Sequence, residues 1–214
     1  MKQYLFFALN LLLALEGTSQ AKGDYMWQIG QNSHPQENPY ALSMVLDFNV
    51  LGINLDTFYR GMKMGYFNAS ISDVDGKLLV YSNGCQIKNG DHSNIPETMS
   101  LSPGETDFEW CLSNPSSGYP KFEGGLFISF FSDSIILLLH QRDYVLSNPT
   151  RIITDSLFYS SVQRDGDQYV LHEKTVPIVG DNLTDGNVEA VKASKPGAWW
   201  VIQGEKNSNR YFSI

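Results

Sequence analysis

Short apolar segments, rich in β-branched and aromatic residues, recur along the chain between Gly, Asn, Asp and Pro. Beyond the N-terminal segment, no stretch repeats apolar residues at the helical spacing of three and four with capping residues at its ends. The pattern therefore predicts an all-β protein. The clearest expected strands are Leu42 to Phe48, Tyr66 to Ser72, Lys77 to Ser82, Gly125 to Phe131, Ser134 to His140, Ser156 to Val162, Tyr169 to Ile178, Ala198 to Gln203 and Arg210 to Ile214.

Pairs of Asp or Asn with Gly mark the turns between these segments. Such pairs accept the positive φ angles of two-residue hairpin turns, so the flanking segments are expected to pair antiparallel. Asp75-Gly76 and Asp165-Gly166 are the strongest of these predictions, because each lies between two strand-like segments. Asn83-Gly84, Asn89-Gly90 and Asp185-Gly186 follow the same rule.

Two segments, 126–131 and 135–139, are apolar on both faces of the expected strand rather than on one. Continuous apolar runs indicate strands that are covered on both sides, as in stacked sheets. A β-propeller and a β-sandwich both meet this requirement. Long polar connections over 88–119 and 141–155 favour the propeller, since a compact sandwich has shorter loops.

Weak internal repetition supports four-stranded antiparallel blades. Leu42 to Ile87, Gly125 to His140 and Ala198 to Ile214 each begin a strand–turn–strand unit of similar order. We expect residues 22–214 to form about two and a half blades, incomplete at the C-terminus, whereas a closed propeller needs at least about four.

Residues 1–21 have the pattern of a signal peptide. Met1-Lys2 is positive, Tyr4 to Leu15 is almost wholly apolar, and Ser19 and Ala21 form a small-x-small cleavage site. The apolar part is shorter than the roughly twenty residues that span a bilayer, so no membrane span is predicted. The sequence thus predicts export.

Cys85 and Cys111 are the two cysteines of the chain. Export would place them in an oxidising compartment, where a disulfide closing a 26-residue loop contributes roughly 3–4 kcal/mol. Two buried free thiols are the alternative. A zinc site is not expected, because no histidines lie nearby in sequence.

Composition excludes one class of partner. The formal net charge is -8 and charged residues make up 18% of the chain, so a nucleic-acid partner, which needs a basic face, is not expected. With 42% hydrophobic residues, the chain can form a packed core.

No catalytic, metal or cofactor motif is found. The four histidines, His34, His92, His140 and His172, are far apart in sequence, and the motifs of hydrolases and nucleotide-binding proteins do not occur. Asp73-x-Asp75-Gly76 resembles the start of a calcium loop, but Lys77 stands where an oxygen ligand would be needed, so a hairpin turn is favoured.

Aromatic residues are the remaining candidates for ligand contact. In Trp199-Trp200, one ring is expected to pack in the core and the other to meet a neighbouring blade. Tyr40, Trp110, Tyr119 and Tyr144 fall in expected loops, where an aromatic side chain could contact a glycan or a peptide.

Several stretches of the chain carry a family resemblance: 46–48, 69–73, 75–87, 101–104, 118–119, 157–160, 190–192 and 199–200, with Cys111. On these residues the chain resembles a group of secreted Bacteroidetes proteins that are predicted β-propellers, many with a sorting domain for type IX secretion. The group tends to carry a His and an Arg-Asp pair where this chain has Ala193 and Gly197-Ala198. The resemblance implies fold and export but no established activity.

We therefore expect a secreted or cell-surface binding or scaffold module without catalytic activity and without a cofactor, whose partner is a protein or a glycan. One alternative is a secreted hydrolase or lyase with loop-borne carboxylates at one end of a propeller. The other is a truncated fragment with no independent function, whose open sheet edge would favour aggregation.

Overall fold

The computed structural model describes residues 25–30, 43–49, 52–58, 61–113, 118–147, 150–195 and 197–213. The expected signal peptide (1–21) and Tyr40 lie outside these residues. Within them the chain is all-β, as predicted, with four antiparallel sheets and one short helical segment.

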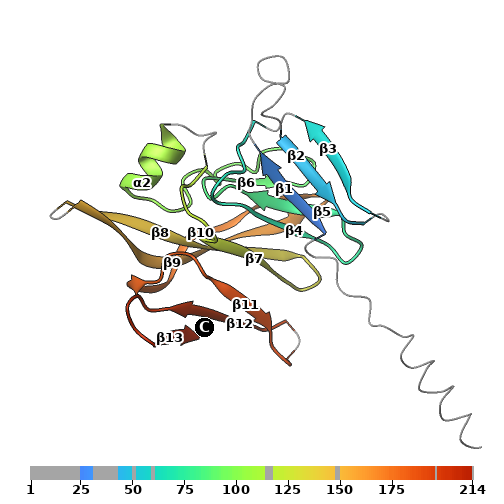
Figure 1. Cartoon of the computed structure of the whole chain (residues 1–214). Coiled ribbons are helices and arrows are strands. Elements are labelled where there is room, and N and C mark those ends of the chain that lie inside the picture. The colour runs from blue at the N-terminus through green and yellow to red at the C-terminus, as the bar shows by residue number, and fades with distance from the viewer. Residues whose placement is uncertain are drawn as a thin grey trace, which may run out of the picture.

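Each sheet is formed by strands that are consecutive in the chain (Figure 1). The first comprises β1 (Met26–Gly30), β2 (Ser43–Asp47) and β3 (Asn54–Phe58), and the second β4 (Ala69–Ser72), β5 (Leu78–Ser82) and β6 (Ile87–Asn89). The third is four-stranded, with β7 (Gly125–Phe130), β8 (Ile135–Ser147), β9 (Thr150–Asp165) and β10 (Gln168–Leu183). The last comprises β11 (Glu189–Lys192), β12 (Trp199–Gly204) and β13 (Tyr211–Ser213).

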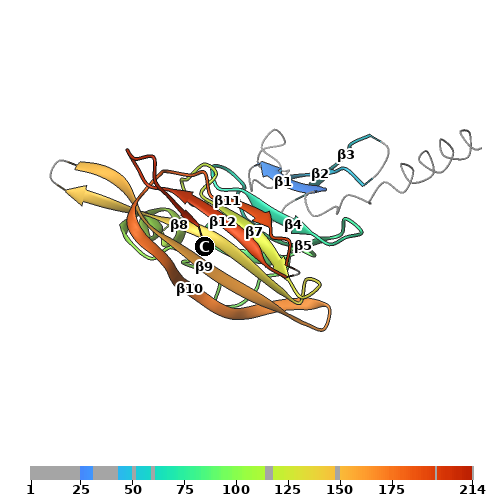
Figure 2. The same ribbon diagram turned by 90° about the horizontal axis from the view of Figure 1, so that it is seen from below.

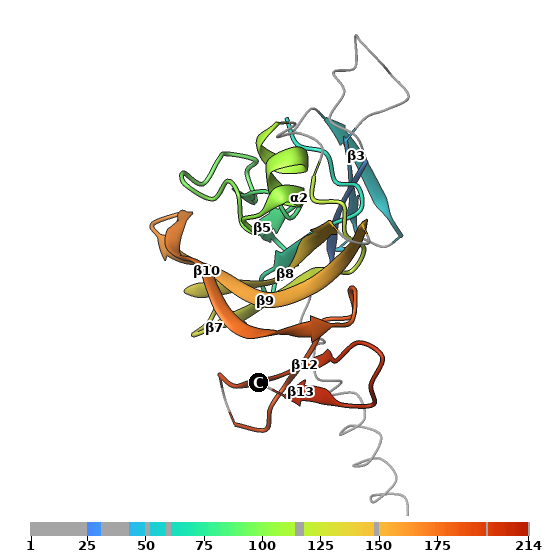
Figure 3. The same ribbon diagram turned by 90° about the vertical axis from the view of Figure 1, so that its left-hand side faces the viewer.

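The sheets are layered in chain order. The four-stranded sheet lies in the middle, with β4–β6 on one side and β11–β13 on the other, while β1–β3 lies beside β4 (Figures 1 and 3). Viewed at right angles, the long strands β8 to β10 extend beyond the shorter strands that cover them (Figure 2). The helix α2 (Glu105–Asp107) and the π-helical turn η1 (Phe108–Leu112) lie beside the C-terminal end of β8.

The two-sided apolar pattern of the central strands is explained by this layering. Because successive side chains of a strand point to opposite faces, Phe127 and Ile136 pack towards β4–β6 in one core cluster. Their neighbours Ile128 and Leu137 pack towards β11–β13 in a second cluster. The prediction that these strands are covered on both faces is confirmed.

The two strongest hairpin predictions are also confirmed. Asp75-Gly76 lies in the turn between β4 and β5, where Oδ1 of Asp73 accepts the backbone N–H groups of Asp75 (3.0 Å) and Lys77 (2.9 Å). Gly76 has φ 86°, which the missing Cβ makes possible. Asp165 pairs with Gln168 across the β9–β10 turn.

Three expectations are wrong in detail. The expected loop 141–155 is mostly strand, because β8 and β9 remain paired as far as Ser147 and Thr150. The expected first unit, 42–87, is divided between two sheets. Asp185-Gly186 joins strands of different sheets rather than a hairpin, and the backbone N–H of Gly186 donates to Oε1 of Gln141 (2.9 Å).

The described part of the chain contains no helix that is both long and apolar enough to cross a membrane.

Candidate functional site

A large groove on the described surface lies where turns from three neighbouring sheets meet. It has a volume of about 760 Å³. Its walls come from the β4–β5, β7–β8 and β11–β12 turns, which lie on the same side of the molecule, to the right in Figure 1. The lining includes Asp73, Phe131, Ser132, Asp133, Arg164, Lys192, Lys195 and Trp199. We call this site the three-turn groove.

The β7–β8 turn in this groove is strained. Phe131, Ser132 and Asp133 have φ angles of 49°, 52° and 63°, so three consecutive residues other than glycine are left-handed. Each such residue costs about 1–2 kcal/mol relative to an ordinary conformation. The turn also presents the Phe131 ring to solvent, with 72% of the residue exposed. Strain of this kind concentrates at functional sites, and here it is combined with an exposed aromatic ring.

Contacts from β9 and β10 hold the strained turn in place. The hydroxyl of Tyr169 donates to the backbone oxygen of Asp133 (2.7 Å), and the N–H of Arg164 donates to the oxygen of Ser134 (2.9 Å). Burial raises the pKa of Tyr169, so its hydroxyl stays protonated and keeps donating. Arg164 also donates to the hydroxyl of Tyr169 (2.8 Å), which links the two supporting residues.

The opposite wall is built on the pairing of Lys192 with Trp199. These residues are directly opposed on β11 and β12, and Nζ of Lys192 lies 5.4 Å from the centre of the Trp199 ring. Nε1 of Trp199 donates to the backbone oxygen of Ser129 on β7 (3.0 Å). The tryptophan therefore joins two sheets and holds a cation in the groove wall.

Trp199 and Trp200 follow the predicted alternation in part. Trp199 packs against the core cluster between the middle sheet and β11–β13, as expected for one of the two rings. Trp200 is 55% exposed, so the described residues do not bury it as the expected contact with a neighbouring blade would.

The groove contains more cationic than anionic side chains, in contrast to the chain as a whole. Arg164, Lys192 and Lys195 are exposed there beside the carboxylates of Asp73 and Asp133, although the whole chain has a formal net charge of -8. One carboxylate oxygen of Asp73 is already bonded to the backbone of its own turn. The arrangement suits a partner with a negatively charged group next to an apolar or ring-shaped one.

The aromatic residues predicted for ligand contact are not brought into this groove. Trp110 is half-buried on η1, and Tyr144 is 50% exposed on β8. For Tyr119 the prediction is wrong: it is 1% exposed, and its hydroxyl accepts the backbone N–H of Asp143 (2.8 Å). Burial raises the pKa of Tyr119 well above its usual value. Tyr119 is a core residue because its segment packs against the C-terminal half of β8 rather than forming an open loop.

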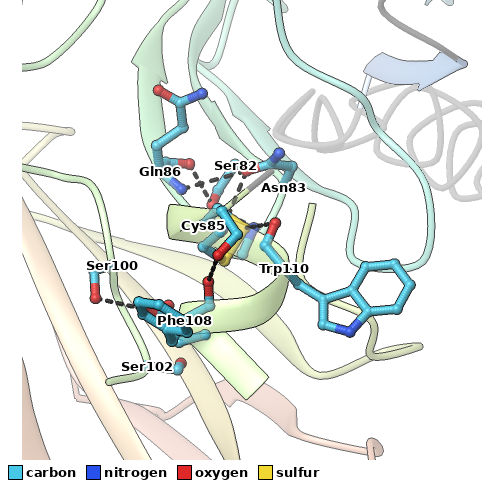
Figure 4. The surroundings of a disulfide bond; sticks show 12 residues. Ser82, Asn83, Cys85, Gln86, Ser100, Ser102, Phe108 and Trp110 are labelled. Carbon is cyan, nitrogen blue, oxygen red and sulfur yellow. Dashed lines mark hydrogen bonds between the residues drawn. A yellow bond between two sulfur atoms is a disulfide. The ribbon is translucent and has the colours of Figure 1, made fainter. Parts of the chain in front are cut away.

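The predicted disulfide is confirmed. Cys85 and Cys111 are joined, with 5.2 Å between their Cα atoms, and both are fully buried. The turn that presents Cys85 is fixed by Oδ1 of Asn83, which accepts the N–H groups of Cys85 (3.1 Å) and Gln86 (3.3 Å) (Figure 4). The indole of Trp110 points away from the sulfur atoms in the same view. The bond ties η1 to the β5–β6 hairpin within the core.

His140 has hydroxyl neighbours of the kind found in hydrolytic sites, but a substrate cannot reach it. His140 lies between the hydroxyls of Ser102 and Ser160, at 2.9 and 3.0 Å, and none of its surface is exposed. A substrate cannot reach a group that is sealed in this way. Within the described residues, no set of three or more His, Cys, Asp or Glu side chains is placed to hold a metal ion.

Sequence reasoning missed the three-turn groove because its walls come from segments far apart in the chain. One signal was available: the turn after the expected strand Gly125 to Phe131 contains no Gly or Asn and directly follows an aromatic doublet, Phe130-Phe131. Comparison with family models, with curated proteins and with solved structures finds no match to this chain.

Proposed function

We propose that this protein is an exported, non-enzymatic binding module whose partner occupies the three-turn groove. The observation that carries the proposal is the turn 131–133, which combines three left-handed residues with an exposed Phe131 ring at the three-turn groove. A strained, exposed turn on a layered scaffold is a common way to present a binding residue.

The partner we propose is a protein or glycan that presents a carboxylate or another anionic group beside an apolar or ring surface. Phe131 supplies the apolar contact, and Arg164, Lys192 and Lys195 supply the positive charge. Because these cations are exposed, the affinity is expected to fall as the salt concentration rises.

Export is supported by two independent features. The N-terminal sequence 1–21 has the order of a signal peptide. The disulfide between Cys85 and Cys111 is a feature that persists in oxidising compartments. A secreted or cell-surface location accounts for both.

We further propose a propeller-like arrangement of the sheets, in keeping with the resemblance to secreted Bacteroidetes β-propeller proteins. In its favour, every sheet is formed by consecutive antiparallel strands, and β4–β6, β7–β10 and β11–β13 stack face to face in chain order. The positions 193 and 197–198, where that group tends to carry polar residues, line the three-turn groove.

Binding to glycan and peptide arrays tests the proposal. The disulfide-bonded protein is applied to both arrays, and the tightest ligand is titrated against the wild type and Phe131→Ser. Removal of the ring is expected to weaken binding at least about tenfold, which corresponds to about 1.4 kcal/mol.

Phe122→Ser is the matched control, because Phe122 is equally exposed (69%) and does not line the groove. It should bind like the wild type. Equal affinity of Phe131→Ser and wild type, or hydrolysis of array glycans without retention, would contradict the proposal.

A further inference from the structure

Lys121 is a lysine buried almost completely in the protein. Its side chain is 1% exposed, and it precedes β7 in the segment 118–124. Its Nζ atom contacts Oδ1 of Asp143, whose side chain is 8% exposed, and lies 2.9 Å from Oγ1 of Thr154. Lysine is among the residues least often buried, so this position requires a specific explanation.

A second carboxylate reaches the same amine from the solvent side. Oδ1 of Asp185 lies 2.7 Å from Nζ of Lys121, and the Asp185 side chain is 72% exposed. The turn that carries Asp185 is fixed, because Gln141 accepts the N–H of Gly186 (2.9 Å) and donates to its oxygen (3.1 Å). The amine of Lys121 therefore contacts a buried carboxylate, that of Asp143, and a solvent-exposed one, that of Asp185.

Burial of the Lys121–Asp143 pair removes both side chains from water. As ions, both groups pay the cost of removal from water, which their attraction offsets only in part. Transfer of one proton from the ammonium to the carboxylate gives a neutral amine beside a neutral carboxylic acid. These are the two partners of an amide condensation.

We propose that Lys121 and Asp143 are joined by a covalent amide bond, formed by the folded protein on itself. Contact between Nζ and Oδ1 brings the amine against the carboxyl group, and an addition begins from near-attack contacts of this kind, at about 3–3.5 Å between the reacting atoms. A bulge in the β8–β9 pairing falls between Arg142 and Asp143, and bulges commonly re-aim a side chain at a reactive site.

The reaction balances without an outside reagent. The nitrogen lone pair attacks the carboxyl carbon of Asp143, and the new N–C bond forms. Asp185 takes a proton from the nitrogen and returns it to the departing hydroxyl, so that one C–O bond breaks and one water leaves. Asp185 is a catalytic residue in this step, because it touches the reacting nitrogen, and its exposure provides the exit for water.

Thr154 suits both the reaction and its product. Its hydroxyl lies 3.2 Å from Oδ1 of Asp143 and donates to it, so it can stabilise negative charge on that oxygen during addition. In the amide, the same hydroxyl donates to the carbonyl oxygen and the remaining N–H faces Asp185. The bond would tie the segment before β7 to β8 and leave no buried charge at this place.

Mass spectrometry of the full chain tests the proposal directly. After reduction of the disulfide, the mass of the protein is expected to be one water molecule lower than the mass calculated for the same chain without the amide bond. Trypsin cannot cleave after an acylated Lys121, so residues 89–142 are expected as one peptide that carries residues 143–151 as a branch. Separate peptides 89–121, 122–142 and 143–151 from the wild type would overturn the proposal.

Two variants assign the roles. Lys121→Arg keeps the positive charge but cannot form the amide bond with Asp143. Its mass should therefore be that of the chain without the bond. Asp185→Asn keeps both bonding partners but removes the proton acceptor, so the bonded fraction should fall at least tenfold at equal times after refolding. Unchanged bonding in Asp185→Asn would overturn the role of Asp185. The wild-type peptides decide the bond itself even if a variant fails to fold.

Discussion

Nδ1 of His140 on β8 lies 2.9 Å from the hydroxyl oxygen of Ser102, in the segment between β6 and β7. The other ring nitrogen of His140 lies 3.0 Å from the hydroxyl of Ser160 on β9. The imidazole is fully buried, and burial lowers the pKa of His140 to about 3. The two hydroxyls satisfy a neutral ring, and no carboxylate of the described residues is hydrogen-bonded to it to compensate a charged one.

Acid should therefore destabilise the fold through His140. The unfolded chain takes up a proton near pH 6.5, while the folded chain does so only near pH 3, so stability is lost as the pH falls between these values. Between pH 6.5 and pH 5 the loss is about 2 kcal/mol. Urea unfolding at both pH values measures it. His140→Gln should lose that part of the dependence, and an unchanged dependence would refute the explanation.

Replacing Ser132 by glycine should stabilise the protein. Ser132 is exposed with φ 52°, and glycine adopts this conformation without the clash that a Cβ causes. We expect a gain of up to about 1 kcal/mol, reduced by the greater freedom of glycine in the unfolded chain. Thermal unfolding of Ser132→Gly and of Ser134→Gly, where φ is not positive, provides the comparison. A lower melting temperature for Ser132→Gly would contradict the strain argument.

Loss of the disulfide should cost about 3–4 kcal/mol for a closed loop of 26 residues. The double variant Cys85→Ser/Cys111→Ser is compared with the wild type by denaturant unfolding under oxidising and reducing conditions. Reductant should lower the stability of the wild type and leave the double variant unchanged. Equal stability of both proteins under oxidising conditions would show that the bond contributes little.

Gly125 on β7 is required by the close approach of its neighbours. A Cβ there would lie 2.3 Å from the backbone oxygen of Leu139 and 2.6 Å from Cζ of Phe67. Gly125→Ala must displace β8 or the Phe67 ring, at a cost of about 1–3 kcal/mol. Gly180→Ala is the control, because nothing lies within 4 Å of its Cβ position and it is also in a strand. Chemical denaturation should separate the two variants.

Prediction from sequence succeeded where the signal is local. The hairpin at Asp75-Gly76 depends on the turn residues themselves, and the structure places the turn there. It failed between residues 141 and 155, where polar residues with Pro and Asn suggested a loop. Tyr144 and Ile153 are strand residues there because β8 and β9 pair with each other. Pairing partners, rather than intrinsic preference, decide such a segment.

The candidate site, too, depends on contacts between distant segments that local sequence does not predict. Phe131 and Lys192 are far apart in the chain and share a groove only because β7–β10 and β11–β13 stack face to face. Tyr119 was expected at the surface, since its neighbours are Pro, Ser and Gly. The packing of segment 118–124 against β8 buries it instead.

The sequence alone determined that the chain is all-β and that its central strands are covered on both faces. It also favoured the pairing of Cys85 with Cys111. These features follow from the period of apolar residues, the chemistry of turns and the number of cysteines, all of which are local or countable. The tertiary structure decided how the strands divide into sheets, which turns line the groove, and that Lys121 meets Asp143 and Asp185. Those contacts join distant segments, and their geometry depends on how whole sheets stack.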